Sequence, residues 1–177
     1  MRALDVGCGT RKIKGAIGID LRKVKGVDVI ADATMLPFKN DCFDKIILSH
    51  IVEHIPDIIC FMREIWRVSK NKATIHIWTP HFTSMNSFTD LTHVRHLTSQ
   101  SFDYFDKTTS LAKDLWFDRE LKFKVKTKRL IFTKRKTRFW NYLIEKLANK
   151  NIARYETILG WIFPCETLYF ELEVLKE

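Results

Sequence analysis

Histidine and carboxylate side chains are concentrated in one polar stretch in the middle of the chain. Residues 79–98 carry His81, Asp90, His93 and His96. A neutral imidazole can accept a proton near pH 7, and imidazole and carboxylate groups are also common metal ligands. The spacing gives His93 and His96 no regular third ligand, so we expect no metal here. We expect His81, His93 and Asp90 to accept a proton or to position a substrate. A purely structural hydrogen-bond network is the competing interpretation.

Polar residues also follow each of the first four short apolar runs of the chain. Continuous apolar runs are typical of strands that are covered on both faces, as in parallel α/β sheets. In such sheets ligands bind at the carboxyl ends of the strands, so the polar residues at these ends are candidates for one shared site. They are the turn Gly7, Cys8, Gly9 and Thr10 after the first run, Asp20 after the second, Asp32 after the third, and Ser49 with His50 after the fourth.

The hydrophobic pattern places these candidates on an alternation of strands and helices. Only about six residues follow Gly9 or Asp20 before the next apolar run, which is too few for crossover helices of about a dozen residues. The pattern predicts strands at residues 3–6, 16–19, 27–30, 43–48, 73–78, 122–134 and 168–175, and helices at residues 57–68, 99–105, 111–116 and 138–150.

Length and composition limit the class of protein. The chain has 177 residues, of which 46% are hydrophobic and 29% charged, so we expect one folded domain rather than a disordered chain. No apolar stretch approaches the length of about eighteen residues that indicates a membrane-spanning helix, and the N-terminus is unlike a signal peptide. We therefore expect a soluble cytoplasmic protein that is not transmembrane. Its cysteines lack CxxC spacing, which favours reduced thiols; they are Cys8, Cys42, Cys60 and Cys165.

The net charge of +9 comes from one segment. Residues 112–150 contain 13 Lys and Arg and 4 Asp and Glu, whereas the rest of the chain has 17 of each sign. A basic excess confined to one segment indicates an anionic partner, such as nucleic acid or a phosphorylated or acidic-lipid substrate. A solvated edge strand that is guarded against aggregation is the competing interpretation. The predicted lysine face and the basic run after it comprise Lys122, Lys124, Lys126, Lys128, Lys134, Arg135 and Lys136.

The segment from Leu4 to Thr10 resembles the first motif of the class I S-adenosylmethionine-dependent methyltransferases, a strand with an acidic residue that leads into a glycine-rich turn. Glycine lets the backbone approach a ligand closely and adopt positive φ. Asp20 matches the family's acidic residue that binds both ribose hydroxyls, and Asp32 matches the one that contacts the adenine amino group. A third glycine is absent, because Arg11 stands at its position.

The blocks at residues 43–44 and 49–55 are similar to the family's next motif, so the resemblance covers residues 3–80. It implies a compact, type 11-like α/β protein: a Rossmann-like three-layer sandwich with a seven-stranded, mainly parallel sheet, an antiparallel last strand and trimmed N-terminal helices. The single domain, residues 1–177, would have a cofactor-binding half (1–80) and an acceptor-side half (81–177) with the basic segment 112–150. The residues implied in cofactor binding are Asp5, Gly7, Cys8, Gly9, Thr10, Asp20, Leu21, Asp32, Ala33, Ser49, His50 and His54.

The function implied by this resemblance is methyl transfer from S-adenosyl-L-methionine to an unidentified acceptor, most simply a small molecule. In-line displacement would leave S-adenosyl-L-homocysteine, and this reaction needs no metal. A non-catalytic S-adenosylmethionine-binding protein and a nucleic-acid-directed methyltransferase that uses the basic segment are the alternatives. A dinucleotide-binding domain is disfavoured, because residues 11–15 leave little room for the helix that would hold a pyrophosphate.

Overall fold

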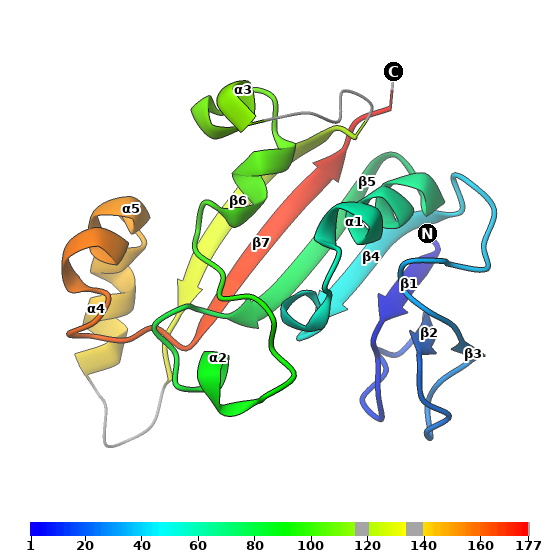
Figure 1. Ribbon diagram of the computed structural model, residues 1–177, viewed down its shortest axis with the longest axis horizontal. Coiled ribbons are helices and arrows are strands. Elements are labelled where there is room, and N and C mark those ends of the chain that lie inside the picture. The colour runs from blue at the N-terminus through cyan, green and yellow to red at the C-terminus, as the bar shows by residue number, and fades with distance from the viewer. Residues whose placement is uncertain (116–120, 134–139, 177) are drawn as a thin grey trace.

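The computed structural model describes residues 1–115, 121–133 and 140–176, and a seven-stranded sheet runs through it in the order β3-β2-β1-β4-β5-β7-β6 (Figure 1). Strands β1 to β5 pair in parallel, and β7 is antiparallel to both of its neighbours. The predicted mainly parallel sheet with an antiparallel last strand is therefore confirmed. The strands are β1 (Ala3–Val6), β2 (Ala16–Asp20), β3 (Val29–Ile30), β4 (Phe43–Ser49), β5 (Ser69–Pro80), β6 (Phe123–Ile131) and β7 (Thr167–Val174).

Helix α1 (Ile58–Val68) precedes β5 and packs on the sheet, as the apolar spacing of residues 57–68 predicted. The Asp57 carboxylate caps its N-terminus by accepting a hydrogen bond of 2.9 Å from Cys60 N. Its buried side chains are Phe61, Met62, Ile65 and Val68. The other helical segments are η1 (Val52–His54), α2 (Asn86–Thr89), η2 (Ser101–Phe105), α3 (Ser110–Leu115), α4 (Trp140–Ala148), α5 (Ile152–Arg154) and η4 (Tyr155–Leu159).

The connections between β1, β2 and β3 contain no helix, as their shortness predicted, and the structure describes every residue of them. A buried carboxylate organises the first connection, because Asp5 Oδ2 accepts a hydrogen bond of 2.8 Å from Ile13 N. Burial raises the pKa of Asp5 above its ordinary value, against the opposing effect of this bond. Asp5 thus folds the loop after β1 back onto its own strand.

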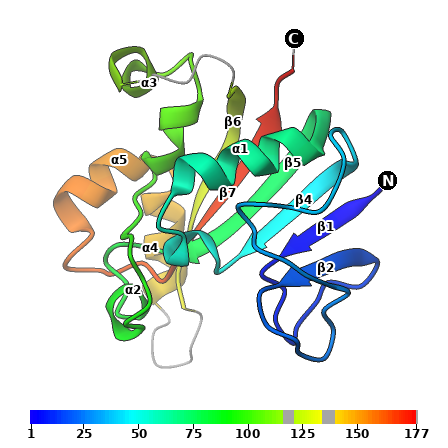
Figure 2. The ribbon, with the colours of Figure 1, turned by 45° about the vertical axis from the view of Figure 1, so that its right-hand side comes forward.

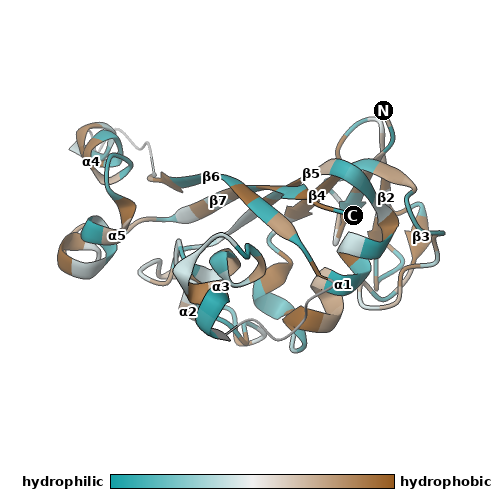
Figure 3. Ribbon diagram, turned by 90° about the horizontal axis from the view of Figure 1, so that it is seen from above, coloured by the Kyte–Doolittle hydropathy of each residue, from teal (hydrophilic) through white to brown (hydrophobic). Residues whose placement is uncertain are grey.

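The two faces of the sheet are covered differently. Helices α1, α2 and α3 lie on one side, and α4 and α5 lie beyond the edge strand β6 (Figures 2 and 3). Along β5, Ile75 and Ile77 are fully buried, whereas the alternate residues His76 and Trp78 are only half-buried. Trp78 packs against Tyr169 of β7 with ring centroids 4.9 Å apart. Of the three layers implied by the resemblance, the one that the N-terminal connections would form is reduced to short loops.

The edge strand β6 corrects one detail of the predicted basic surface. A bulge near its middle shifts the register, and a shift of one residue moves the following side chains to the other face. Lys124 and Lys126 are exposed, but Lys128 is half-buried and its Nζ lies 2.6 Å from the Asp103 carboxylate. The lysines therefore do not form one continuous face. The basic run Lys134, Arg135 and Lys136 and the last residue of the predicted helix 111–116 lie outside the described residues.

The four cysteines are free, as their spacing predicted. Burial raises the pKa of Cys165 to about 12, so this thiol stays protonated and unreactive. Within the described ranges, no helix combines the length and the apolar character that crossing a bilayer requires.

Candidate functional site

Two glycines with positive φ shape the turn after β1. Gly7 has a φ of 69° and Gly9 a φ of 49°, which other residues rarely adopt. A Cβ on Gly7 would lie 2.7 Å from Ile51 Cδ1, so the turn packs closely against the segment that follows β4. Cys8 N donates to Ile19 O at 3.0 Å and fixes the turn to β2. The turn is a stretch of backbone that a ligand can approach closely.

Asp20 ends β2 beside this turn. Its Oδ2 accepts a hydrogen bond of 3.0 Å from Gly9 N, and its Oδ1 accepts bonds of 2.9 and 3.1 Å from Arg22 N and Nε. Burial is the largest influence and acts to raise the pKa of Asp20, but the bonds from Arg22 and Gly9 outweigh it and the pKa is lowered. The Arg22 side chain is 73% exposed, so it can move away at little cost. The anionic carboxylate then has acceptor sites for hydroxyl groups.

Asp32 follows β3 on the same edge of the sheet. Its Oδ1 accepts bonds of 2.8 and 2.7 Å from Thr34 N and Oγ1, which lower the pKa of Asp32. Acceptors for hydroxyl and amino donors beside an open glycine turn fit the adenosine and amino-acid parts of S-adenosylmethionine. Of the other residues predicted to bind this cofactor, Thr10, Leu21 and Ser49 are exposed, and Cys8 and Ala33 are buried.

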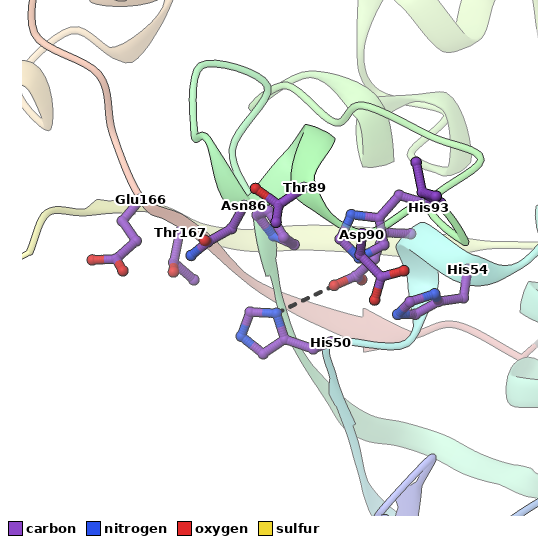
Figure 4. Close-up of a pocket in the computed structure, with 11 residues that line it drawn as sticks. His50, His54, Asn86, Thr89, Asp90, His93, Glu166 and Thr167 are labelled. Atoms are coloured by element: carbon purple, nitrogen blue, oxygen red, sulfur yellow. Dashed lines mark hydrogen bonds and ion pairs between the residues drawn. The ribbon is translucent and has the colours of Figure 1, made fainter.

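A pocket of about 740 Å³ lies next to this edge, at the carboxyl ends of β4 and β5 (Figure 4). It brings together histidines and an aspartate that are distant in the sequence, including two residues predicted as catalytic and two predicted to bind the cofactor. Its lining residues are His50, Glu53, His54, Pro80, Asn86, Thr89, Asp90, Leu91, His93, Glu166 and Thr167.

His50 is oriented by a buried carboxylate. Its φ of 54° lies in the left-handed region, and its backbone N donates to Trp78 O at 2.8 Å. Its Nδ1 lies 3.2 Å from Glu53 Oε1, the contact drawn as a dashed line in Figure 4. Glu53 is 1% exposed and also accepts a bond of 3.1 Å from Thr79 Oγ1. Because a carboxylate oxygen only accepts, His50 Nδ1 carries the proton and the neutral ring keeps its lone pair on Nε2.

The same reasoning assigns the tautomers of His54 and His93. Thr92 Oγ1 donates its one proton to Asp90 Oδ1 at 2.7 Å, so it accepts the bond of 2.9 Å from His54 Nδ1. His93 Nδ1 lies 3.2 Å from the carbonyl oxygen of Ser87, which also only accepts. The lone pair of each neutral ring is therefore on Nε2. The two rings meet edge to face with centroids 4.6 Å apart.

His81 does not reach this pocket, which corrects the expectation that it faces the acceptor. Its side chain is fully buried, with Nδ1 2.6 Å from Thr83 Oγ1 and Nε2 3.1 Å from Glu156 Oε1. Glu156 also accepts two bonds of 2.7 Å from Ser99 N and Oγ. Burial acts to raise the pKa of Glu156, but the bonds from His81 and Ser99 outweigh it and the pKa is lowered. Both nitrogens of His81 are occupied, so it belongs to a structural network.

Glu53 and Thr92 were not predicted from the sequence. Glu53 follows His50 by three residues and directly precedes His54, so a single helical turn brings the carboxylate under the first imidazole. That spacing was the available signal for Glu53. The contact of Thr92 with His54 joins segments 38 residues apart, and no local pattern reveals it.

Glu53, His54 and His93 also form a group of potential metal ligands. One donor atom from each lies within 4.8 Å of the other two. All three residues line the pocket. The same side chains could therefore hold a cation or take part in proton transfer.

A second depression lies between β6 and α4, and we call it the basic groove. Its volume is about 560 Å³. Arg129 is paired with Glu145 at 3.2 Å, while Lys146 and Lys150 are exposed. The groove is lined by Thr127, Lys128, Arg129, Tyr142, Glu145, Lys146, Asn149 and Lys150.

The N-terminal half of the chain is similar to known methyltransferases. The type 11 family model, described as "Methyltransferase domain", matches residues 4–77. The demethylmenaquinone methyltransferase of Roseiflexus sp. (strain RS-1) is 31% identical over 96 residues, which are 42% of this chain and 40% of that protein. The protein of the same name from Roseiflexus castenholzii (strain DSM 13941 / HLO8) is 32% identical over the same shares of 42% and 40%. The match thus spans about two fifths of these curated relatives.

Solved structures match over nearly the whole chain. A putative methyltransferase from Bacillus halodurans C-125 has a TM-score of 0.62 at 13% identity and covers 99% of this chain and 93% of that one. A SAM-dependent methyltransferase from Archaeoglobus fulgidus has a TM-score of 0.58 at 20% identity, with 97% and 85% covered. The [4+2]-cyclase SpnF has a TM-score of 0.61 at 16% identity, with 99% and 75% covered, so the fold alone does not fix the reaction. The predicted resemblance to class I S-adenosylmethionine-dependent methyltransferases is confirmed, and the reaction has to be argued from the site.

Proposed function

We propose that this chain transfers a methyl group from S-adenosyl-L-methionine to a small molecule bound in the pocket beside β4 and β5. The observation that carries the proposal is the arrangement of two consecutive residues after β4. Ile51 packs against Gly7 of the glycine turn, and its neighbour His50 lines the pocket. The cofactor edge and the pocket therefore meet at one point of the backbone, where donor and acceptor would be held together.

The residues at the ends of β1 to β3 would hold the cofactor. The Gly7 and Gly9 backbone would take its amino-acid part, Asp20 its ribose hydroxyls and Asp32 its adenine amino group. When bound, the cofactor supplies an activated methyl group on a sulfonium, and the thioether that remains is neutral. No residue then has to protonate a leaving group, so the task of the protein is to position the acceptor and to remove its proton.

The pocket supports a polar small molecule as the acceptor. Its volume of about 740 Å³ lies in the range that binds small ligands. Hydrogen bonds from Thr92 lower the pKa of Asp90, so this carboxylate stays anionic and can accept a bond from an acceptor hydroxyl or amine. Asp90 and His93 keep their proposed roles of positioning the acceptor and of proton transfer. The curated relatives are named for demethylmenaquinone, so that compound belongs in the acceptor panel.

The test has two stages that separate cofactor binding from turnover. Calorimetric titration with S-adenosyl-L-homocysteine should show one site per chain. Methyl-labelled cofactor should then label a small molecule in a cell extract or an acceptor panel. Labelling should fall at least about a hundred-fold in His93→Ala but persist in His76→Ala, which removes an imidazole from the opposite face of the sheet. Cofactor binding without any labelling would favour a non-catalytic binding protein.

The basic groove supports a second, independent contact with an anionic partner. Lys146 and Lys150 are exposed there, and the whole net charge of the chain lies in residues 112–150. Phosphate groups of nucleic acid or of an acidic lipid would bind such a groove with strong salt dependence. This contact would hold a partner or a large acceptor beyond the pocket, without taking part in the reaction.

A further inference from the structure

We propose that Glu53, His54 and His93 bind a divalent transition-metal ion of the zinc class in the acceptor pocket. The sequence favoured no metal because the spacing of His93 and His96 offers no regular third ligand. The fold instead brings Glu53 and His54 of η1 together with His93 in one pocket. Metal binding does not depend on the proposed methyl transfer, whereas the role given to the ion below rests on it.

The donor set determines the class of metal. Two imidazoles and one carboxylate are the ligands of catalytic zinc sites, which keep further positions open for water or substrate. Imidazole nitrogen suits zinc, iron, nickel and copper, whereas magnesium and calcium prefer oxygen ligands throughout. Glu53, His54 and His93 therefore favour zinc over magnesium.

Each proposed ligand is already held by an outer partner. His54 donates its Nδ1 proton to Thr92 Oγ1 at 2.9 Å, and His93 donates its own to the Ser87 carbonyl at 3.2 Å. Metal-binding histidines show this arrangement, in which one nitrogen donates to an oxygen and the other binds the ion. The Glu53 carboxylate is fixed in the same way by His50 and Thr79.

Hydrogen bonds also hold the two ligand-bearing segments together. Val94 N donates to Glu53 O at 2.9 Å, and Arg95 Nε donates to Ile55 O at 3.0 Å. Arg95 Nη2 also bonds to the carbonyl oxygen of Pro56. The segment that carries His93 is thus fixed to the segment that carries Glu53 and His54.

Metal binding requires a small movement. Donor atoms on one zinc ion, each about 2 Å from the metal, lie at most about 4 Å apart, and here they lie within 4.8 Å of one another. His93 N bonds to Asp90 O at 3.1 Å in a turn whose other residues are exposed. This turn can close by about 1 Å without disturbing the core, because exposed turns have few packed contacts to lose.

The ion would give the pocket a binding point for an acceptor oxygen. An oxygen bound at an open position loses its proton more readily, because the ion stabilises the negative charge left on it. The O–H bond would break with both electrons on that oxygen, and the proton would pass to water. His93 would then hold the ion rather than accept the proton, because its Nε2 is the proposed ligand atom. A hydroxyl-bearing acceptor is therefore the class that this site selects.

Metal binding is measured on the full chain, purified without a histidine tag and stripped with a chelator. Titration with Co²⁺ should produce absorption bands of a nitrogen-ligated ion, and calorimetry with Zn²⁺ should give one site per chain. His54→Ala and His93→Ala should each weaken Zn²⁺ binding by at least about 100-fold, and Thr92→Val by about 10-fold. His96→Ala is the matched control, because His96 lies in the same loop but stacks on Phe88 with centroids 4.1 Å apart.

Three results would overturn the proposal: no cobalt bands and no zinc heat with the wild-type chain, equal weakening by His96→Ala, or tighter binding of Mg²⁺ than of Zn²⁺. The circular dichroism spectrum and the thermal unfolding midpoint serve as the folding check for each variant, and His93→Gln replaces His93→Ala if the latter does not fold. Full methyl transfer by the chain after its metal has been removed with a chelator would reject the role of the ion in the reaction, but not the metal site itself. Zinc binding without methyl transfer would reject the proposed function and leave the metal site standing.

Discussion

Histidines occur in two settings in this molecule, and they differ in how many ring nitrogens the protein occupies. His81 is fully buried and bonds through both nitrogens, to Thr83 and Glu156. The pocket residues His50, His54 and His93 bond through Nδ1, and no described group of the protein bonds to their Nε2 atoms. His50 and His81 each directly follow the carboxyl end of a strand, β4 and β5, so position at a strand end does not separate the two settings. Proton transfer and ligand binding both need a ring nitrogen that no protein group occupies and that a ligand can reach.

The two settings also differ in what a substitution exposes. Removal of His81 leaves the Glu156 carboxylate, whose side chain is 10% exposed, without one of its partners, and a buried charge without its partner is costly. Removal of His54 from the pocket leaves its partner Thr92, which is exposed and can bond to water instead. The buried network should therefore respond through stability, and the pocket through binding and turnover.

The largest effect on stability should come from His81→Ala. Loss of the buried ring and of the bond to Glu156 should lower the free energy of unfolding by roughly 3 to 5 kcal/mol. His54→Ala, in the pocket, should cost less than about 1 kcal/mol. Urea unfolding followed by circular dichroism measures both, and equal losses would remove the distinction between the two settings.

Two carboxylates, Asp20 and Asp28, allow a similar comparison for the proposed cofactor site. Asp20→Ala should weaken S-adenosylmethionine binding about thirty-fold or more, since it removes two charge-assisted hydrogen bonds worth roughly 2 to 4 kcal/mol. Asp28 is the matched control: it accepts from Gly18 N at 2.7 Å and pairs with Lys12 at 2.8 Å, so its bonds are internal. Calorimetry should show near wild-type affinity for Asp28→Ala, and unchanged affinity in folded Asp20→Ala would reject the ribose assignment.

Acid should weaken the buried network. The pKa of Glu156 is lower in the folded chain than its ordinary value of 4.5, so its contribution to stability is complete above that value and is lost as the pH falls through the folded pKa. The difference in unfolding midpoint between the wild type and Glu156→Gln should be large at pH 7 and shrink as the pH drops below about 4.5. A difference that stays constant down to the lowest pH at which the chain folds would show that the network does not titrate.

The smallest effect should come from single lysines of the basic groove. Lys146→Ala should reduce by about one the slope of log affinity against log salt for RNA or for anionic vesicles, if each phosphate contact releases one counterion. Lys25→Ala removes an exposed lysine from the β2–β3 connection and should leave the slope unchanged. No binding to either probe at low salt would assign the groove lysines to a solvated surface.

Much of the fold could be read from local pattern. Apolar runs located β1, β2 and β4, and the spacing of Asp57 to Val68 located α1, because strand and helix periodicities act within a few residues. Strand β5 begins earlier than predicted, at Ser69. The residues that follow Ser69 in this strand are polar and exposed, so no hydrophobic pattern indicates where the strand begins; they are Lys70, Asn71 and Lys72.

The candidate site could be read only where one segment supplied it. Gly7 and Gly9 lie within one turn, and their positive φ confirms the conformational need that their type indicated. The partner of His81 is Glu156, 75 residues away, so the sequence could not show that this imidazole was already occupied. The pocket could not be predicted from the sequence for the same reason, because η1 and the turn at Asp90 are distant along the chain and meet only in the folded structure.

The left-handed backbone of His50 sets a limit on how far this sequence can be stabilised. A non-glycine residue with a φ of 54° carries a conformational cost of about 1 kcal/mol or more that glycine avoids. Selection for heat tolerance alone would therefore favour glycine or asparagine at position 50. Either replacement removes the imidazole at the junction of the two proposed sites, so thermal stability and the proposed methyl transfer would compete at a single dihedral angle.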